Sequence, residues 1–187
     1  MGQKEEAIVK AAICVMSRYG VKRTTMNDIA SAAEISRQTL YNSFANKDEI
    51  LRAAVRHGCE QSVANVRQDW QEKPALGDRL DSFFQHTVIF YYDFIHSSPD
   101  ADDIVSGFNE AGKDEIEKTQ IQYQALLKEA LDPYEPAIVK AGMTVAQLAD
   151  IVCVSAVGYK YRAHDRAHLE GLLRSLKIMV LTLAGSR

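Results

Sequence analysis

Two short segments with polar caps near the N-terminus constrain this chain more than any other feature of its sequence. Thr25 can cap the first segment, with Asp28 three residues later as its capping-box partner. Ser36 is a good cap for the second segment. Only residues 33–35 remain for the connection between them. The sequence therefore predicts two short helices joined by a tight turn.

The second of these helices has two chemically different sides. Leu40 and Phe44 are four residues apart and lie on one apolar side, whereas Arg37 and Gln38 belong to a polar and basic side. A helix with these two sides can pack against a small domain and lie in the major groove of DNA. The alternative is a plain helical hairpin inside an all-α core, because two capped short helices occur in many proteins.

The flanking residues complete a small helical head. Residues 4–19 repeat apolar side chains at three- and four-residue steps, and Gly20 is well placed to end this helix with a positive φ angle. Asn46 can cap a further, long helix with Glu49 as its return partner. We therefore expect a three-helix head that a fourth helix connects to the rest of the chain.

The order and spacing of these residues resemble the DNA-binding domain of the TetR family of bacterial regulators. The resemblance covers roughly the first 55 to 60 residues and rests on Gly20, Thr24, Thr25, Ile29, Ala30, Ala33, Ser36, Leu40, Tyr41, Phe44 and residues 47–51. The chain departs from the family at Glu34, where glycine is frequent, and at Ser43, where a larger residue is common. Glu34 puts a less permissive residue and a negative charge in the turn.

Roles within the head follow from side-chain chemistry and from the resemblance. Residues 37–39 begin the second helix of the pair, where Arg can pair with guanine and Gln with adenine. The resemblance implies that residues 41, 42 and 47 contact phosphates, and the free N–H groups at the start of the first helix of the pair favour an anion. The predicted DNA-binding residues are Thr25, Ser36, Arg37, Gln38, Thr39, Tyr41, Asn42 and Lys47.

Charge is distributed unevenly along the chain. Residues 1–57 hold nine Lys or Arg and six Asp or Glu, which gives +3, whereas residues 58–187 hold 13 basic and 19 acidic residues, which gives −6. The two values add to the net charge of −3 for the whole chain. The mild overall acidity thus hides a positive N-terminal part, which agrees with DNA binding although a solvated surface can produce the same difference.

The remaining residues predict a second helical domain. Pro74 and Gly77 separate the long fourth helix from a helix over residues 76–97, and Ser98-Pro99-Asp100 ends that helix. No run of alternating β-branched residues indicates a strand. We therefore expect an all-α fold with a helix-turn-helix head at residues 1–46. Residues 47–187 would form the helical effector-binding and dimerisation domain that the resemblance implies.

An aromatic segment in this domain is the predicted effector site. Aromatic and histidine side chains crowd residues 83–96, and an aromatic helix that faces the interior could line an apolar pocket. Such residues fill an ordinary core as well, and periodicity does not separate the two. The resemblance implies that an unidentified small molecule shifts the separation of two heads and so changes DNA affinity. The candidate pocket residues are Phe84, His86, Phe90, Tyr91 and Phe94.

The sequence predicts two C-terminal helices, one capped by Thr144 and a final one that follows residues 163–165, and they carry more apolar surface than one core-facing stripe requires. In the family, the corresponding helices of two subunits form a four-helix bundle, which implies a homodimer. Two recognition helices about 34–36 Å apart would then match successive major grooves of a palindrome. The alternative is that these side chains only close the core of one chain. The predicted interface residues are Val152, Ala156, Tyr159, Leu169, Leu173, Leu176 and Val180.

Other chemistries receive less support from the sequence. His164 and His168 have a spacing that can bind a metal, but no further ligands lie nearby in sequence and Asp165 is explained as a helix cap, so we expect no metal site. The three cysteines are far apart, as in reduced intracellular proteins, and a thiol redox sensor lacks support. The sequence has no phosphate-binding loop and no nucleophile elbow, so we expect no cofactor and no catalysis. Without a signal peptide or a run of about 18 apolar residues, we expect no membrane partner and a cytoplasmic location.

The sequence therefore predicts a transcriptional regulator, most simply a repressor that binds a palindromic operator as a homodimer and is released by a small-molecule effector. A helical enzyme and a partner-binding helical adaptor are the alternatives from other functional classes. The choice between repression and activation depends on where the operator lies relative to the promoter, which the protein sequence does not contain.

Overall fold

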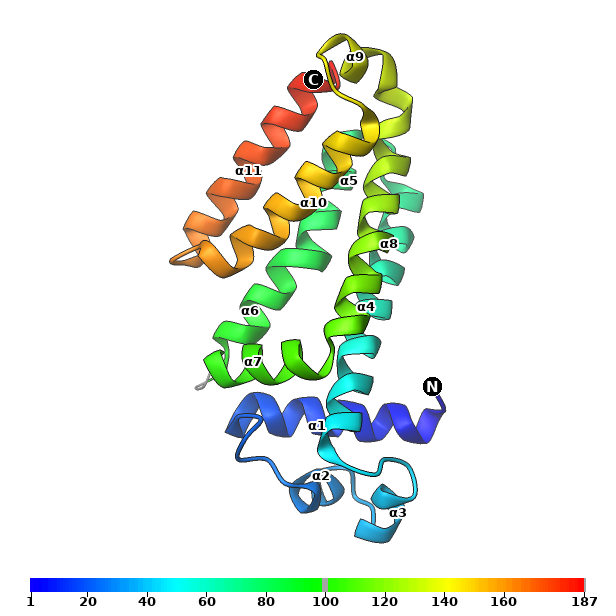
Figure 1. Ribbon diagram of the computed structural model, residues 1–187, viewed down its shortest axis with the longest axis vertical. Coiled ribbons are helices and arrows are strands. Elements are labelled where there is room, and N and C mark those ends of the chain that lie inside the picture. Colours follow the sequence, from blue (N-terminus) through cyan, green and yellow to red (C-terminus); the bar gives the residue numbers. More distant parts are fainter. Residues whose placement is uncertain (99–100, 187) are drawn as a thin grey trace. The chain divides into compact units, whose positions relative to one another are not determined.

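The computed structural model describes residues 1–98 and 101–186, and within these ranges it contains helices and turns but no strand (Figure 1). The predicted all-α fold is confirmed. The predicted helix stop at Pro99 and Asp100 lies outside the described residues. The helices are α1 (Gln3–Tyr19), α2 (Met26–Ala32), α3 (Arg37–Tyr41), α4 (Lys47–Glu72), α5 (Leu76–Phe84), the π-helix η1 (Gln85–Ile89), α6 (Phe90–His96), α7 (Ala101–Ala111), α8 (Lys113–Leu131), the 3₁₀-helix η2 (Asp132–Tyr134), α9 (Glu135–Lys140), α10 (Val145–Arg162) and α11 (Arg166–Leu183).

The chain divides into two compact units. Unit 1 consists of Met1–Glu60 and Phe94–Glu117, and unit 2 consists of Gln61–Asp93 and Lys118–Arg187. Each unit has an apolar core of its own. The head at residues 1–46 therefore packs with a segment from the middle of the chain. The division expected at residues 46 and 47 remains a prediction about domains.

The core of unit 1 is built from apolar positions at helical spacing. Helix α1 buries Ile8 and Met16, α2 buries Ile29, α3 buries Leu40, and α7 adds Ile104. All five side chains are almost fully removed from solvent. Burial on this scale contributes about 1.5–3 kcal/mol for each large aliphatic side chain, before the entropy of ordering is subtracted. Helix α7 is thus a structural part of the unit that carries the head.

Two glycines allow the 94–117 segment to approach the rest of unit 1 closely. A Cβ atom added at Gly107 would lie 2.8 Å from Cγ1 of Val21. A Cβ atom added at Gly112 would lie 2.5 Å from both γ-methyl carbons of Val55. Carbon atoms pack at about 3.5–4.0 Å. Only a residue without a side chain fits at these two positions in the present packing.

A buried carboxylate makes a polar connection at the same place. Asp103 of α7 is 5% exposed, and its Oδ2 accepts a hydrogen bond of 2.8 Å from the backbone N–H of Lys22. The Nζ of Lys22 lies 3.6 Å from Oδ1 of the same carboxylate, but the Lys22 side chain is almost fully in solvent. The backbone contact therefore fixes the loop between α1 and α2 more firmly than the ion pair does.

In unit 2, helices α10 and α11 lie side by side, and they pack against η1 and α5 respectively (Figure 1). Their inner sides form most of the C-terminal part of the core. The predicted dimer-interface residues are found there. Six are at most 3% exposed, and Tyr159 is partly buried against the same core: Val152, Ala156, Tyr159, Leu169, Leu173, Leu176 and Val180.

These seven positions thus belong to the core of a single chain, and an interface there stays a prediction. The apolar stripe of each helix is the face that η1 and α5 cover, so its side chains close the core of one chain. The opposite side of the same two helices carries a separate set of exposed apolar residues, namely Ile151, Val154, Tyr161, Ile178 and Met179. We refer to these five residues as the outer face.

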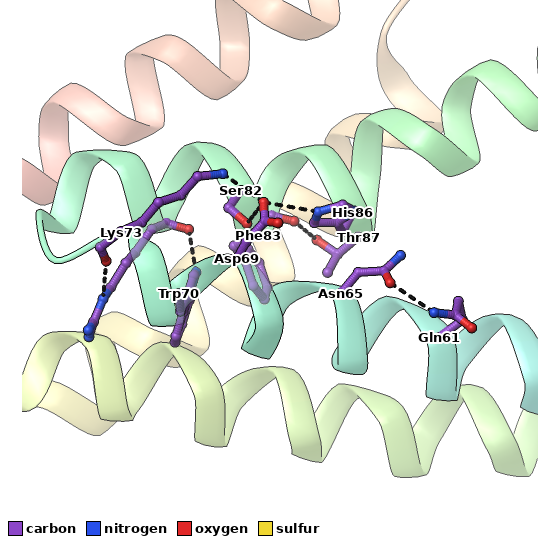
Figure 2. Close-up of polar contacts among 10 residues, drawn as sticks. Gln61, Asn65, Asp69, Trp70, Lys73, Ser82, Phe83, His86 and Thr87 are labelled. Atoms are coloured by element: carbon purple, nitrogen blue, oxygen red, sulfur yellow. Dashed lines mark hydrogen bonds and ion pairs between the residues drawn. The ribbon is translucent and has the colours of Figure 1, made fainter.

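The helix expected over residues 76–97 is interrupted by the π-helix η1. Within this region the Oγ1 of Thr87 donates to the carbonyl oxygen of Phe83 over 2.7 Å (Figure 2). π-Helical turns are rare and widen the backbone locally.

Among the described residues, no single helix is long and apolar enough to cross a membrane, and one bent pair, Lys113–Lys140 with Val145–Arg162, passes that test by length and composition only.

A polar cluster connects α4 with α5 and η1. Oδ2 of Asp69 accepts hydrogen bonds from Nζ of Lys73 at 2.7 Å and from Oγ of Ser82 at 2.8 Å, and Nε2 of His86 lies 3.2 Å away (Figure 2). The Lys73 contact first, and then the Ser82 hydroxyl, hold the pKa of the Asp69 carboxyl at about 2. Asp69 is therefore ionised whenever the protein is folded near neutral pH.

Candidate nucleic-acid interface

Helix α2 begins with the capping box that the sequence predicts. The N–H of Asp28 donates to Oγ1 of Thr25, and both the N–H and the hydroxyl of Thr25 donate to Oδ2 of Asp28, at 2.8 and 2.7 Å. These hydrogen bonds from Thr25 lower the pKa of the Asp28 carboxyl. Both donors of Thr25 are thus used inside the cap, and the contact of Thr25 with a phosphate stays a prediction.

The turn between α2 and α3 requires an unusual backbone conformation. Glu34 has a φ angle of 54° and is the one non-glycine residue of the described chain with a positive φ. The following N–H, of Ile35, donates to the carbonyl oxygen of Ala30 over 3.0 Å and closes the turn. A non-glycine residue in this region costs about 1 kcal/mol or more. The departure from glycine at this position therefore keeps the turn but strains it.

Helix α3 starts at the predicted cap and divides into the two predicted sides. Oγ of Ser36 accepts from the N–H of Thr39 at 3.1 Å. Leu40 and Phe44 are buried in the core of unit 1, so the helix is held by its apolar side. Arg37 and Gln38 are exposed in the first turn. The cap and the two buried anchors therefore leave the polar side of a very short helix in solvent.

The polar side of α3 holds donors that can reach a ligand. Nε2 of Gln38 donates to Oδ1 of Asn42 over 3.0 Å, so these two side chains order one another along the helix. Arg37 forms no ion pair with any residue that the structure describes. Tyr41 is 44% exposed. An unpaired guanidinium beside amide and phenol groups can contact base edges and phosphates.

Lys47 has a role that sequence reasoning missed. Its Nζ donates to the carbonyl oxygen of Val21 at 2.8 Å and to that of Thr24 at 3.1 Å. An ammonium group has three N–H donors, so one remains for a phosphate. Lys47 thus ties the start of α4 to the loop before α2. No sequence signal could have shown this, because the partners are backbone oxygens more than twenty residues away.

The start of α4 differs in one detail from the expected capping box. Asn46 caps the helix as predicted, since its Oδ1 accepts from the N–H of Glu49 at 3.0 Å. The Glu49 carboxylate does not return to Asn46 itself, because its Oε2 accepts from the N–H of Ala45 at 2.7 Å. The return contact is therefore shifted by one residue, and the end of the head is held at two successive positions.

The predicted pocket residues are divided between the two units, and a pocket that they line stays a prediction. Phe84 belongs to the filled core of unit 2, Phe90 is exposed, and Phe94 belongs to unit 1, where its ring meets that of Phe108. His86 faces Asp69, and Tyr91 packs edge-on against Phe90. A surface hollow of about 390 Å³ lies elsewhere in unit 2, lined by Gln124, Ala125, Lys128, Ala146, Ala149 and Asp150.

Comparison with known proteins adds to this geometry. Residues 8–54 match the model of the family described as bacterial regulatory proteins, tetR family. The HTH-type transcriptional regulator YerO of Bacillus subtilis is 28% identical over 96 residues, which cover 46% of this chain and 33% of that protein. The nicotine-responsive transcriptional repressor HdnoR of Paenarthrobacter nicotinovorans is 33% identical over 63 residues, covering 34% and 32%. The chain thus matches about a third of the length of these curated relatives.

The fold as a whole is shared more widely than the sequence. A transcriptional regulator from Cytophaga hutchinsonii superposes with a TM-score of 0.73 over 98% of both chains, at 15% sequence identity. At this identity the likeness concerns the fold alone. The matched family model covers the capped helices α2 and α3 and the start of α4, which are the elements that hold the predicted DNA-binding residues.

Proposed function

We propose that the chain is a transcriptional regulator of the tetR family, whose model matches residues 8–54, and that it is a repressor that binds operator DNA through α3. The observation that carries the proposal is the capped helix with an unpaired arginine on its solvent side. Arg37, Gln38 and Thr39 would reach base edges, because they occupy the first turn of the helix that enters the groove. Tyr41, Asn42 and the remaining N–H of Lys47 would contact phosphates.

A gel-shift titration tests this assignment. Duplexes that cover the DNA upstream of the protein's own gene are offered at low and moderate salt, since phosphate contacts make the affinity fall as salt rises. Arg37→Ala should weaken binding by about ten- to a hundredfold, the value of one lost base contact. Arg67→Ala is the matched control, because it removes an exposed arginine from the unit 2 part of α4. Failure of the wild-type chain to bind any such duplex at low salt would contradict the proposal.

The operator would be palindromic and bound by a homodimer formed through the outer face. Two exposed members of that face, Val154 and Ile178, are four and seven residues from Gly158 and Gly171 respectively, where an added Cβ would meet nothing within 4 Å. Small residues between exposed apolar ones allow two helices to approach closely, as a four-helix contact between two chains requires. A second copy of this chain is the occupant, because paired heads are what a palindromic site needs.

Sedimentation velocity tests the dimer. Ile178→Asp places a charge in the proposed interface and should convert the protein to a monomer at micromolar concentration. Ile121→Asp is the matched control, because Ile121 is also a strongly exposed isoleucine but lies on α8. A stable wild-type monomer at that concentration would exclude the interface, and so would an unchanged dimer in the Ile178 variant.

Release from DNA would depend on a small molecule bound in unit 2. The proposal is supported by the fact that one relative, HdnoR, is named as nicotine-responsive. A ligand can shift DNA binding only if its affinity differs between the DNA-bound and free arrangements. Native mass spectrometry of the protein isolated from its own host tests for a bound molecule. The proposal fails if small-molecule extracts of that host leave DNA affinity unchanged.

A further inference from the structure

The turn between α10 and α11 brings two imidazoles into direct contact. His164 precedes the N-cap residue of α11 and His168 lies in the first turn of that helix. The Nδ1 atoms of the two rings face each other, and the ring centroids are 4.0 Å apart. Two nitrogens of the same kind thus meet at one point although neither ring is buried. This pair has no part in the proposed DNA contacts or in the outer face.

The position of the pair is fixed by the helix cap. Oδ1 of Asp165 accepts from the N–H of His168 at 2.7 Å, and this backbone hydrogen bond lowers the pKa of the Asp165 carboxyl. Oδ2 of the same carboxylate lies 3.7 Å from Nε2 of His164. Asp165 therefore fixes the backbone of His168 with one carboxylate oxygen and faces Nε2 of His164 with the other. Metal-binding histidines commonly have a carboxylate on that side.

Nδ1 of His168 offers a nitrogen lone pair at the meeting point. This nitrogen accepts a long hydrogen bond of 3.5 Å from the backbone N–H of His164, which a bound ion would replace. The imidazole lone pair is the usual nitrogen ligand for zinc, nickel and copper ions. A second Nδ1 directly opposite makes the two rings a chelating pair once both are neutral.

The surrounding charges do not oppose a cation. Arg162 and Arg166 are both two residues from His164. Nε of Arg166 donates to Oδ1 of Asp93 at 2.7 Å while its Nη1 contacts Glu170, so two carboxylates offset this charge. The Asp165 carboxylate adds a negative charge beside His164. The local field therefore favours a bound cation rather than an anion.

We propose that His164 and His168 bind one divalent transition-metal ion, Cu²⁺, Ni²⁺ or Zn²⁺, through their Nδ1 atoms. Water would complete the coordination, because the part of the chain that the structure describes offers no third histidine, cysteine or carboxylate ligand at this place. The His164 side chain is 71% exposed, so the ion can enter and leave freely. This inference goes beyond the proposed function. It reverses the expectation of no metal site, because the sequence alone did not show that the two rings face each other.

Isothermal titration of the full chain with NiCl₂ tests the site. We expect one ion per chain for the wild type and no binding for His164→Ala or His168→Ala. His57→Ala is the matched control, because it removes a histidine from α4, and it should bind like the wild type. Asp165→Ala should weaken binding about tenfold, as the loss of an orienting carboxylate does. Circular dichroism checks that each variant keeps its helices.

A second measurement does not depend on substitution. Substoichiometric Cu²⁺ should broaden the imidazole proton resonances of His164 and His168 before those of the other three histidines. Equal broadening of all five, or nickel binding that survives in both histidine variants, would overturn the proposal. The absence of any heat with nickel together with unbroadened imidazole resonances would overturn it as well.

Discussion

Four glycines in two regions of the molecule show how differently one residue type is used. Gly107 and Gly112 of unit 1 have Val21 and Val55 pressed against them, at distances that leave no room for a methyl group. Gly158 and Gly171 of α10 and α11, in unit 2, have nothing near the place of a side chain. The first pair permits packing that already exists within the chain. The second pair marks a surface that this chain alone leaves uncovered.

The largest expected effect is at the closed pair. Gly112→Ala should lower the free energy of unfolding by about 2–3 kcal/mol, because the new Cβ overlaps both γ-methyl groups of Val55 and overpacking costs about 1–3 kcal/mol. Urea denaturation followed by circular dichroism measures the change. An unaltered midpoint would mean that the α7–α8 junction moves freely away from α4, and the contrast between the two glycine pairs would then be lost.

The buried carboxylate of the same region should give the next effect. Asp103→Ala leaves the backbone N–H of Lys22 without its acceptor and should cost about 2 kcal/mol. Lys22→Ala is the control: it keeps that N–H and removes only an exposed ion pair, so it should cost less than about 1 kcal/mol. Equal losses in the two variants would show that the ion pair, and not the backbone contact, fixes the loop.

Local and long-range contacts within unit 1 also differ in what the sequence could predict. The caps of α2, α3 and α4 are local, since Thr25, Ser36 and Asn46 each act on a residue three positions later. Such contacts are encoded in neighbouring residues and were predicted correctly, apart from the exact partner of Glu49. The hydrogen bond from Lys22 to Asp103 joins residues 81 positions apart, and no local pattern contains it.

Helices α10 and α11 show another limit of prediction from sequence. Helical periodicity identifies which residues share a side, but not whether that side meets the same chain or another one. Leu173 and Val180 form a strong apolar stripe, and the core of unit 2 uses it. Val154 and Ile178 belong to the additional apolar surface of α10 and α11, and their side chains are exposed. A wide stripe is thus typical of a core helix, and the weaker stripe behind it is the candidate for assembly.

A second carboxylate sharpens the comparison between the units. Asp69 of unit 2 is partly exposed and has a pKa of about 2, against an ordinary value of 3.8. Because its pKa is lower in the folded protein, its contribution to stability is present above about pH 4 and is lost as the pH falls towards 2. After allowance for solvent screening, we expect about 1 kcal/mol. Asp69→Asn should lose this part of the stability at pH 6 but differ little from the wild type at pH 2.

Urea midpoints of both proteins at pH 6, 4 and 2 measure this difference. If the difference in urea midpoint between wild type and variant stays constant over this pH range, the contacts with Lys73, Ser82 and His86 hold Asn as well as they hold the carboxylate. The cluster would then be a packing feature rather than an electrostatic one. Of the two carboxylates, Asp69 and Asp103, only the buried Asp103 of unit 1 would then contribute to stability through its charge and hydrogen bonds.

The smallest expected effect is at the uncovered glycines, Gly158 and Gly171, and it tests whether a second copy of the chain covers the outer face. Gly171→Ala should stabilise the isolated subunit by about 0.5–1 kcal/mol, because alanine favours the helix and its Cβ meets no atom of the same chain. If a second copy covers this face, the same methyl group enters the interface, so the dissociation constant of the dimer should rise. Thermal unfolding at low concentration and sedimentation equilibrium measure the two quantities separately. A gain in stability with unchanged association would place the dimer contact elsewhere on α10 and α11, because a methyl group at the centre of a close helix contact cannot leave that contact unaffected.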